Sequence, residues 1–246
     1  MDSFDVSSKL DGKKIKVSWD LKKGNAAVYA IQGRRPHMED RFNIVNDLEH
    51  TNTSIFGVFD GHGGEFAAEF TEKTLFKSLM IQLLKASLEE NSLNLTELMT
   101  QEMLNVDNQL LGITRSNMDI SERKRIKQAG GFISFNGVWR VAGVLATSRA
   151  IGDYPLKDKN LVTAEPDVFT FDLNELKPQF IILATDGLWD CFSNQEAVDY
   201  IKDRLHEPHF GAKSLVLQAY YRGSLDNISV LVVNLMSDTF TNVDGQ

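Results

Sequence analysis

The chain has one cysteine, no long apolar run and no surplus of basic residues. Cys191 alone cannot form a disulfide within the chain, and no cluster of cysteine and histidine has the spacing of a structural zinc site. This cysteine usage indicates a reducing compartment, so we expect a cytoplasmic protein. No stretch of about 18 apolar residues is present, so the sequence predicts no membrane-spanning segment. Residues 1–14 are polar and charged, without a signal-peptide core.

The charge balance is acidic: 34 Asp and Glu residues against 26 Lys and Arg residues leave a net charge of −8. Nucleic-acid-binding proteins usually carry a basic surplus, so we expect no nucleic-acid partner. An acidic surplus either aids solubility or gathers carboxylates that hold cations, and composition leaves both interpretations open. With 246 residues and 42% hydrophobic residues, the chain is long enough to bury a core.

The order of apolar patterns predicts a polar lead-in over residues 1–25 and one folded domain over residues 26–246. Strands are expected at residues 15–19, 26–31, 41–45, 55–59, 168–173, 180–184 and 228–236. Helices are expected at residues 65–86, 95–111, 121–129, 194–205 and 211–221, with a polar connection at 112–120 and a hairpin at 132–141. The first two helices have apolar stripes typical of core packing.

Several of the expected strands are bordered by an aspartate. Asp60-Gly61-His62-Gly63-Gly64 follows the strand 55–59, and Asp186-Gly187 follows the strand 180–184. Asp226 precedes the last strand, and Asp40 lies between two others. Each aspartate alone could be an ordinary turn residue, and Arg35, Glu39 and Asp40 could form a solvated loop with a weak surface ion pair.

Strand ends at one sheet edge converge, so these four carboxylates could meet. They cannot all stay ionised in a cleft without cations. Oxygen-rich clusters without cysteine suit Mg²⁺ or Mn²⁺, and two such ions can activate a shared water and hold an oxyanion substrate. The guanidinium of Arg35 suits two phosphate oxygens, and His62 could protonate a leaving oxygen.

Five motifs in this order resemble the metal-dependent serine/threonine protein phosphatases, the PPM or type 2C family. The resemblance covers residues 27–236, and residues 207–214 are similar to one member in particular. The motifs are Arg35-x-x-x-Glu39-Asp40, Phe59-Asp60-Gly61-His62-Gly63-Gly64, Ser148-Arg149-Ala150-Ile151-Gly152-Asp153, Thr185-Asp186-Gly187-Leu188-Trp189-Asp190 and Asp226-Asn227. Five ordered motifs are far more specific than any one of them.

The resemblance implies an α+β fold: a four-layer αββα sandwich of two antiparallel sheets flanked by helix pairs. It also implies the hydrolysis of phosphoserine and phosphothreonine in proteins by a monomer, with two Mg²⁺ or Mn²⁺ ions activating the attacking water. Arg35 would hold the phosphate and His62 would act as general acid. The implied metal ligands are Asp60, the Gly61 carbonyl, Asp186 and Asp226, with Asp40 and Glu39 acting through coordinated waters and Asp190 at a weaker third site.

One departure from the family pattern concerns the centre of the chain. The family has several strands, with Gly-Thr-Thr and Gly-Asp-Ser-Arg motifs, between the helix pair and the segment near Ser121. Neither motif is present, so we expect an incomplete sandwich, shortened near residues 111–121, as in a splice variant or an incomplete gene model. Losing inner strands would expose apolar neighbours and unpaired strand edges.

This departure motivates an alternative function: a catalytically impaired, phosphatase-like binding protein. Two other classes agree poorly with the sequence. A calcium-binding module would need a twelve-residue loop with regular ligand spacing, which is absent. A phosphoaspartyl phosphatase would need Asp-x-Asp at a strand end, whereas Asp60-Gly61-His62 has no second carboxylate.

Overall fold

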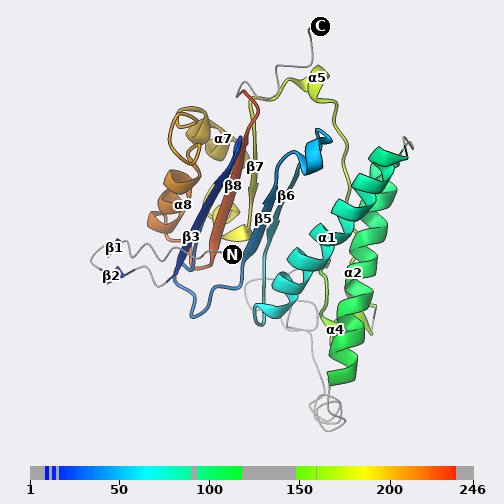
Figure 1. The fold of residues 1–246 in the computed structure, drawn as a ribbon. Helices are drawn as coiled ribbons and strands as arrows, with labels where there is room; N and C mark the ends of the chain where they lie inside the picture. Colours follow the sequence, from blue (N-terminus) through cyan, green and yellow to red (C-terminus); the bar gives the residue numbers. More distant parts are fainter. Residues whose placement is uncertain are drawn as a thin grey trace, which may run out of the picture. The chain divides into compact units, whose positions relative to one another are not determined.

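A computed structural model describes residues 9–10, 13–14, 17–89, 93–117, 148–158 and 160–236 (Figure 1). The chain divides into two compact units. The first contains residues 1–72 and 171–246, and the second contains residues 73–170. Within the described residues, no helix is both long and apolar enough to cross a membrane.

The first unit is built on a four-stranded antiparallel sheet with the strand order β3-β4-β8-β7. Its strands are β3 (Ser18–Lys23), β4 (Ala26–Ile31), β8 (Ile228–Asn234) and β7 (Phe180–Ala184). All six residues of β4 are buried, as are six of the seven in β8. The two central strands are therefore continuous apolar runs, because both faces of the sheet are covered.

The two faces of this sheet pack against different elements. One face packs against α7 (Asn194–Lys202) and α8 (Ala212–Tyr221) through a shared apolar core. The other face packs against a two-stranded antiparallel sheet of β5 (Arg41–Val45) and β6 (Ile55–Phe59). Figure 1 shows these three layers of the first unit, with helices on one side and the small sheet on the other.

The short elements of the first unit lie in its loops. They are β1 (Lys9–Leu10), β2 (Lys13–Lys14), the 3₁₀ helix η1 (Leu48–His50), α5 (Leu173–Leu176) and α6 (Asp186–Trp189). The single turn α6 matters most for the site, because it begins two residues after the end of β7.

The second unit contains most of α1 (Phe66–Leu88), together with α2 (Leu95–Asn117) and α4 (Tyr154–Lys157). The helices α1 and α2 lie side by side in Figure 1, and Ser78 on α1 donates a 2.5 Å hydrogen bond to Glu102 on α2. Asp107 on α2 accepts a 2.7 Å hydrogen bond from the Gly152 N–H and lies 2.7 Å from the Lys157 ammonium. These buried polar contacts join α2 to residues 152–157.

The α+β class with two antiparallel sheets is confirmed, and the strands 26–31, 41–45, 55–59 and 180–184 have the expected bounds.

Two expectations are wrong. The polar connection expected from residue 112 is helical through Asn117, since α2 continues there. Residues 168–173 form no strand and pair with none of the described strands, and Phe169 and Phe171 are 76% and 70% exposed. The strand expected at 15–19 begins at Ser18, and the segments 121–129 and 132–141 lie outside the described residues.

Candidate metal centre

The acidic motifs meet at one edge of the two sheets in the first unit. Asp60 directly follows β6, and Asp40 directly precedes β5, to which β6 is paired in register. Asp186 is the first residue of α6 after β7, and Asp226 lies two residues before β8. Because β5 with β6 and β7 with β8 are antiparallel pairs, the end of one strand lies beside the start of its partner.

Asn227 holds two of these loops together. Its side chain is buried, accepts a 2.7 Å hydrogen bond from the Glu39 N–H, and donates bonds of 2.8 and 2.9 Å to the carbonyls of Gln32 and His37. The segment 32–39, which carries Arg35 and Glu39, is thereby fastened to the start of β8. The sequence motif included Asn227 but did not indicate this role.

Three glycines allow the loops to approach closely. A Cβ atom on Gly33, Gly61 or Gly187 would overlap a backbone carbonyl oxygen, those of Asp226, Glu39 and Asn227 respectively. Only Gly33 of these three has a positive φ, of 62°. Close backbone contact is therefore the constraint common to all three positions.

Asp40 is the buried member of the acidic cluster, with 2% exposure. Its Oδ2 atom accepts hydrogen bonds from the Thr185 hydroxyl at 2.9 Å and the Ser229 hydroxyl at 2.7 Å. Burial raises the pKa of Asp40 to about 7, and the negative charges of Asp60 and Asp226 act in the same direction. Thr185 opens one of the sequence motifs, which did not indicate this contact, and Ser229 lies outside the motifs.

Asp60 and Asp186 are in direct contact through a 3.2 Å hydrogen bond from the Asp186 N–H to the Asp60 carboxylate. Burial, together with the negative charges of Asp60, Asp226 and Asp190, raises the pKa of Asp186 to about 7. Burial also raises the pKa of Asp60. Mutual repulsion of this kind is relieved by a cation between the carboxylates.

Arg35 and Glu39 contact the cluster from the segment before β5. The Arg35 guanidinium lies 2.5 Å from the Asp226 carboxylate, while the Arg35 side chain is 53% exposed. The Glu39 carboxylate accepts a 2.8 Å hydrogen bond from the Gly64 N–H. Arg35 therefore has a counter-ion at the edge of the acidic cluster and a face open to solvent.

His62 and Asp190 lie at the exposed side of the cluster. The charge of His62 acts to lower the pKa of Asp60, against the larger effect of burial, so the imidazole lies close to that carboxylate. The Asp190 N–H donates a 2.9 Å hydrogen bond to the Asp186 carbonyl across α6. All nine residues expected at the site belong to the first unit.

The donor set suits a hard divalent cation, since it consists of carboxylate and carbonyl oxygens with two carboxyl pKa values raised to about 7. Within the described part of the chain, no three Asp, Glu, His or Cys side chains converge at metal-binding spacing as they stand. Metal ligation by these residues therefore remains a prediction.

Comparison with known proteins adds independent findings. The family model described as "Protein phosphatase 2C" matches residues 25–116 and 114–228. The chain is 46% identical to Protein phosphatase 1L from Bos taurus, over 91% of this chain and 76% of the relative. It is 37% identical to Probable protein phosphatase 2C 59 from Arabidopsis thaliana, over 84% of this chain and 78% of the relative.

Among solved structures, the serine-threonine phosphatase 2C from Toxoplasma gondii is similar with a TM-score of 0.68. The match covers 89% of this chain and 98% of that one, and at 21% identity it bears on the fold alone. The similarity of residues 207–214 to one particular member of the family was a similarity to this type of phosphatase, the one represented here by the bovine relative. The chain therefore belongs to the protein phosphatase 2C family of metal-dependent serine/threonine phosphatases, as the ordered motifs predicted.

Proposed function

We propose that this chain hydrolyses phosphoserine and phosphothreonine esters in proteins at a site for two Mg²⁺ or Mn²⁺ ions. The observation that carries the proposal is the hydrogen bond from the Asp186 N–H to the Asp60 carboxylate, which brings together two residues 126 positions apart whose carboxyl pKa values are both raised. Asp226 and Asp190 add negative charge to the same cluster. A repulsive cluster of this kind costs stability unless cations bind it.

The residues that would hold the ions are Asp60, the Gly61 carbonyl, Asp186 and Asp226. Asp40 and Glu39 would act through coordinated waters, and Asp190 would serve a weaker third site. When bound, such ions lower the pKa of a coordinated water and neutralise charge on a phosphate ester. Asp40 suits an indirect role, because its Oδ2 atom already accepts two hydroxyl hydrogen bonds.

The chain itself would orient the phosphate and supply a proton. The Arg35 guanidinium has several N–H donors, of which one binds Asp226, and its exposed face can bind phosphate oxygens. The exposed imidazole of His62, close to Asp60, can protonate the serine or threonine oxygen as it leaves. Neither role requires a phosphorylated enzyme intermediate.

The test compares turnover of a phosphoserine peptide with and without Mn²⁺. We expect Mn²⁺-dependent release of phosphate, and a loss of about 100-fold or more in Asp60→Asn, because the ions supply several kcal/mol of charge stabilisation. Asp203→Asn removes an exposed carboxylate at the end of α7 and serves as the matched control with unchanged rate. Equal rates in the wild type and Asp60→Asn would reject the assignment.

The alternative function is a phosphatase-like binding protein that lacks core strands. Two findings support this alternative. The family model matches in two pieces that meet at residues 114–116. The bovine alignment runs over 273 residues, whereas 91% of this 246-residue chain is about 224 residues, so about 50 positions have no counterpart here. Cooperative thermal unfolding together with metal-dependent turnover would exclude this alternative.

Phosphoproteins are the substrates that the family implies. A monomeric state and a cytoplasmic location remain predictions, the latter resting on the single cysteine, Cys191.

A further inference from the structure

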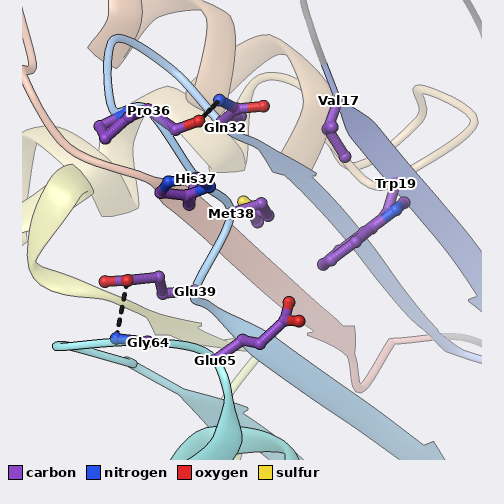
Figure 2. Close-up of a pocket in the computed structure, with 9 residues that line it drawn as sticks. All are labelled: Val17, Trp19, Gln32, Pro36, His37, Met38, Glu39, Gly64 and Glu65. Atoms are coloured by element: carbon purple, nitrogen blue, oxygen red, sulfur yellow. Dashed lines mark hydrogen bonds between the residues drawn. The ribbon is translucent and has the colours of Figure 1, made fainter.

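A pocket of about 480 Å³ lies beside the acidic cluster in the first unit (Figure 2). Its size is in the range of pockets that hold small ligands or single side chains. It is formed by Val17 and Trp19 at the start of β3, by the segment 32–39 and by the two residues before α1. The wall residues that matter here are Val17, Trp19, Pro36, Met38, Glu39 and Glu65.

The pocket borders the proposed phosphate site. Pro36 directly follows Arg35 in the chain, and Glu39 lines the pocket while its charge acts on Arg35. Gly64, the last residue of the Asp-Gly-His-Gly-Gly loop, is a wall residue too. A peptide whose phosphorylated side chain contacts Arg35 would therefore pass along this pocket with a neighbouring residue.

The walls combine an apolar body with acidic groups. Val17, Pro36, Met38 and the Trp19 ring form the apolar part, and Glu65 has a side chain that is 63% exposed. In Figure 2 the Glu65 side chain points toward the part of the pocket bounded by Trp19 and Met38, whereas the Glu39 carboxylate turns to the Gly64 N–H. Glu65 is therefore the accessible acidic group of the pocket.

Among the described residues, the wall of the pocket carries two carboxylates, those of Glu39 and Glu65, beside the imidazole of His37 and no lysine or arginine. The Arg41 guanidinium lies 2.6 Å from Glu65, 3.6 Å from Glu69 and 5.3 Å from the centre of the Trp19 ring. The Arg41 guanidinium, which is not part of the wall, thus contacts the carboxylates of both Glu65 and Glu69. An aromatic and aliphatic wall with surplus negative charge suits a side chain with an apolar stem and a cationic head.

We propose that this pocket binds a lysine or arginine side chain next to the phosphorylated residue, so that the chain selects phosphopeptides with a basic neighbour. The proposal rests on the proposed function, since it concerns the substrate class of the same site. An acidic side chain would be repelled by the carboxylates of Glu65 and Glu39. A purely apolar side chain would desolvate the Glu65 carboxylate, whose partner Arg41 also contacts Glu69.

The experiment measures binding separately from turnover. Fluorescently labelled peptides carry a non-hydrolysable phosphonate analogue of phosphoserine and one arginine, placed in turn within about four residues on either side, since an extended peptide rises about 3.3 Å per residue. Matched peptides carry lysine, norleucine or glutamate at that position. We expect arginine or lysine at one position to bind about three- to five-fold more tightly than norleucine, and glutamate to bind more weakly.

Glu65→Gln and Glu65→Arg test the acidic wall. Glu65→Gln should remove most of the preference for basic peptides, and Glu65→Arg should reverse it toward glutamate. Glu69→Gln is the matched control, because Glu69 contacts the same Arg41 but is not a wall residue of the pocket. Hydrolysis of p-nitrophenyl phosphate, which is too small to fill the pocket, reports the proposed catalytic function and should be unchanged in all three variants.

The outcomes separate the two proposals. Equal binding of basic and norleucine peptides by the wild type, or equal effects of Glu65→Gln and Glu69→Gln, would overturn the pocket assignment. If the wild type does not hydrolyse p-nitrophenyl phosphate but still binds the basic peptides more tightly than the norleucine peptide, the catalytic proposal is rejected. The pocket assignment then stands.

Discussion

Asp40 is the most buried acidic residue of the cluster, whereas Asp60 and Asp186 retain exposed surface although the surrounding loops partly desolvate their carboxyl groups. Its carboxyl group receives two hydroxyl hydrogen bonds, yet its pKa is still raised to about 7. Burial therefore outweighs the hydrogen bonds when no cation is bound. The proposed metal ions would complete the charge balance of this cluster.

The metal-free chain should lose stability as the pH rises from about 4 to about 7. Asp40 and Asp186 ionise near pH 3.8 in the unfolded chain but keep their protons to about pH 7 in the folded chain. Across this range the unfolded state binds fewer protons, so the free energy of unfolding falls with pH. Urea denaturation in the presence of EDTA at pH 5 and pH 7.5 measures the difference.

Two comparisons sharpen this test. Asp40→Asn should reduce the fall in stability, because the amide does not titrate, and Mg²⁺ at pH 7.5 should raise the stability of the wild type. Asp203→Asn, on the surface, should retain the full pH dependence. A metal-free wild type that becomes more stable toward pH 7.5 would contradict the raised pKa values.

Gly187→Ala should destabilise the chain by about 1–3 kcal/mol, a typical cost of forcing extra atoms into a packed site. The new methyl group would overlap the Asn227 carbonyl oxygen and push α6 away from the start of β8. Gly112→Ala is the matched control: nothing lies within 4 Å of its Cβ position on α2, so a gain of up to about 1 kcal/mol is expected. Chemical denaturation measures the free energy of unfolding of both variants. Similar changes in the two variants would contradict the close contact between Gly187 and Asn227.

At the scale of elements, α7 begins with a complete capping box. The Ser193 hydroxyl accepts from the Glu196 N–H, and the Glu196 carboxylate accepts from the Ser193 N–H. These hydrogen bonds lower the pKa of Glu196. The helix carries Ala197 and Ile201 into the core beneath the main sheet, so its first turn contributes to the packing of that layer.

Ser193→Ala should cost about 1 kcal/mol of stability at pH 7, the usual effect of losing an N-cap hydroxyl. The effect should shrink as the pH falls below about 4.5, because the contribution of ionised Glu196 is lost there. Gln195→Ala, which removes only a surface hydrogen bond to Asp199, should change stability by less than about 0.5 kcal/mol. Thermal unfolding curves of both variants provide the measurement, and a Ser193→Ala chain as stable as Gln195→Ala would refute the cap.

At the scale of the whole molecule, the small sheet is the weak point. Among the described residues it contains only β5 and β6, and all five residues of β6 are partly exposed. An isolated pair of strands is marginally stable in water. The packing of Phe42, Ile44, Phe56 and Val58 onto the main sheet supplies the remaining stabilisation.

Restoring the central segment should stabilise the chain. We expect a chimera that carries the corresponding residues of the bovine relative between positions 111 and 121 to unfold at a higher temperature and to bind less of a hydrophobic dye. The physical reason is that added strands would cover the apolar edge of the small sheet. Calorimetry and dye fluorescence of the two chains make the comparison, and identical curves would argue against missing strands.

Much of the site could be predicted from local patterns. A buried run that ends in Asp-Gly is readable within about ten residues, so Asp60 and Asp186 were found together with β6 and β7. The contacts that hold the loops together could not be predicted. Asn227, Thr185 and Ser229 act through partners 44 to 195 positions away, and no local pattern indicates such hydrogen bonds. The prediction of a strand at 168–173 was wrong for a related reason. Alternating apolar and polar residues form a strand only where a second strand, distant in the sequence, pairs with them.

The amino-acid sequence alone determined the family, the strands that border the site and the acidic residues at their ends, because each is a property of short segments in a set order. Only the tertiary structure decided which carboxylate is buried, that Arg35 contacts Asp226, and that a pocket with an acidic wall lies beside them. Charge state and pocket shape depend on groups that the fold brings together from distant positions, and those distances exist only once the chain is folded.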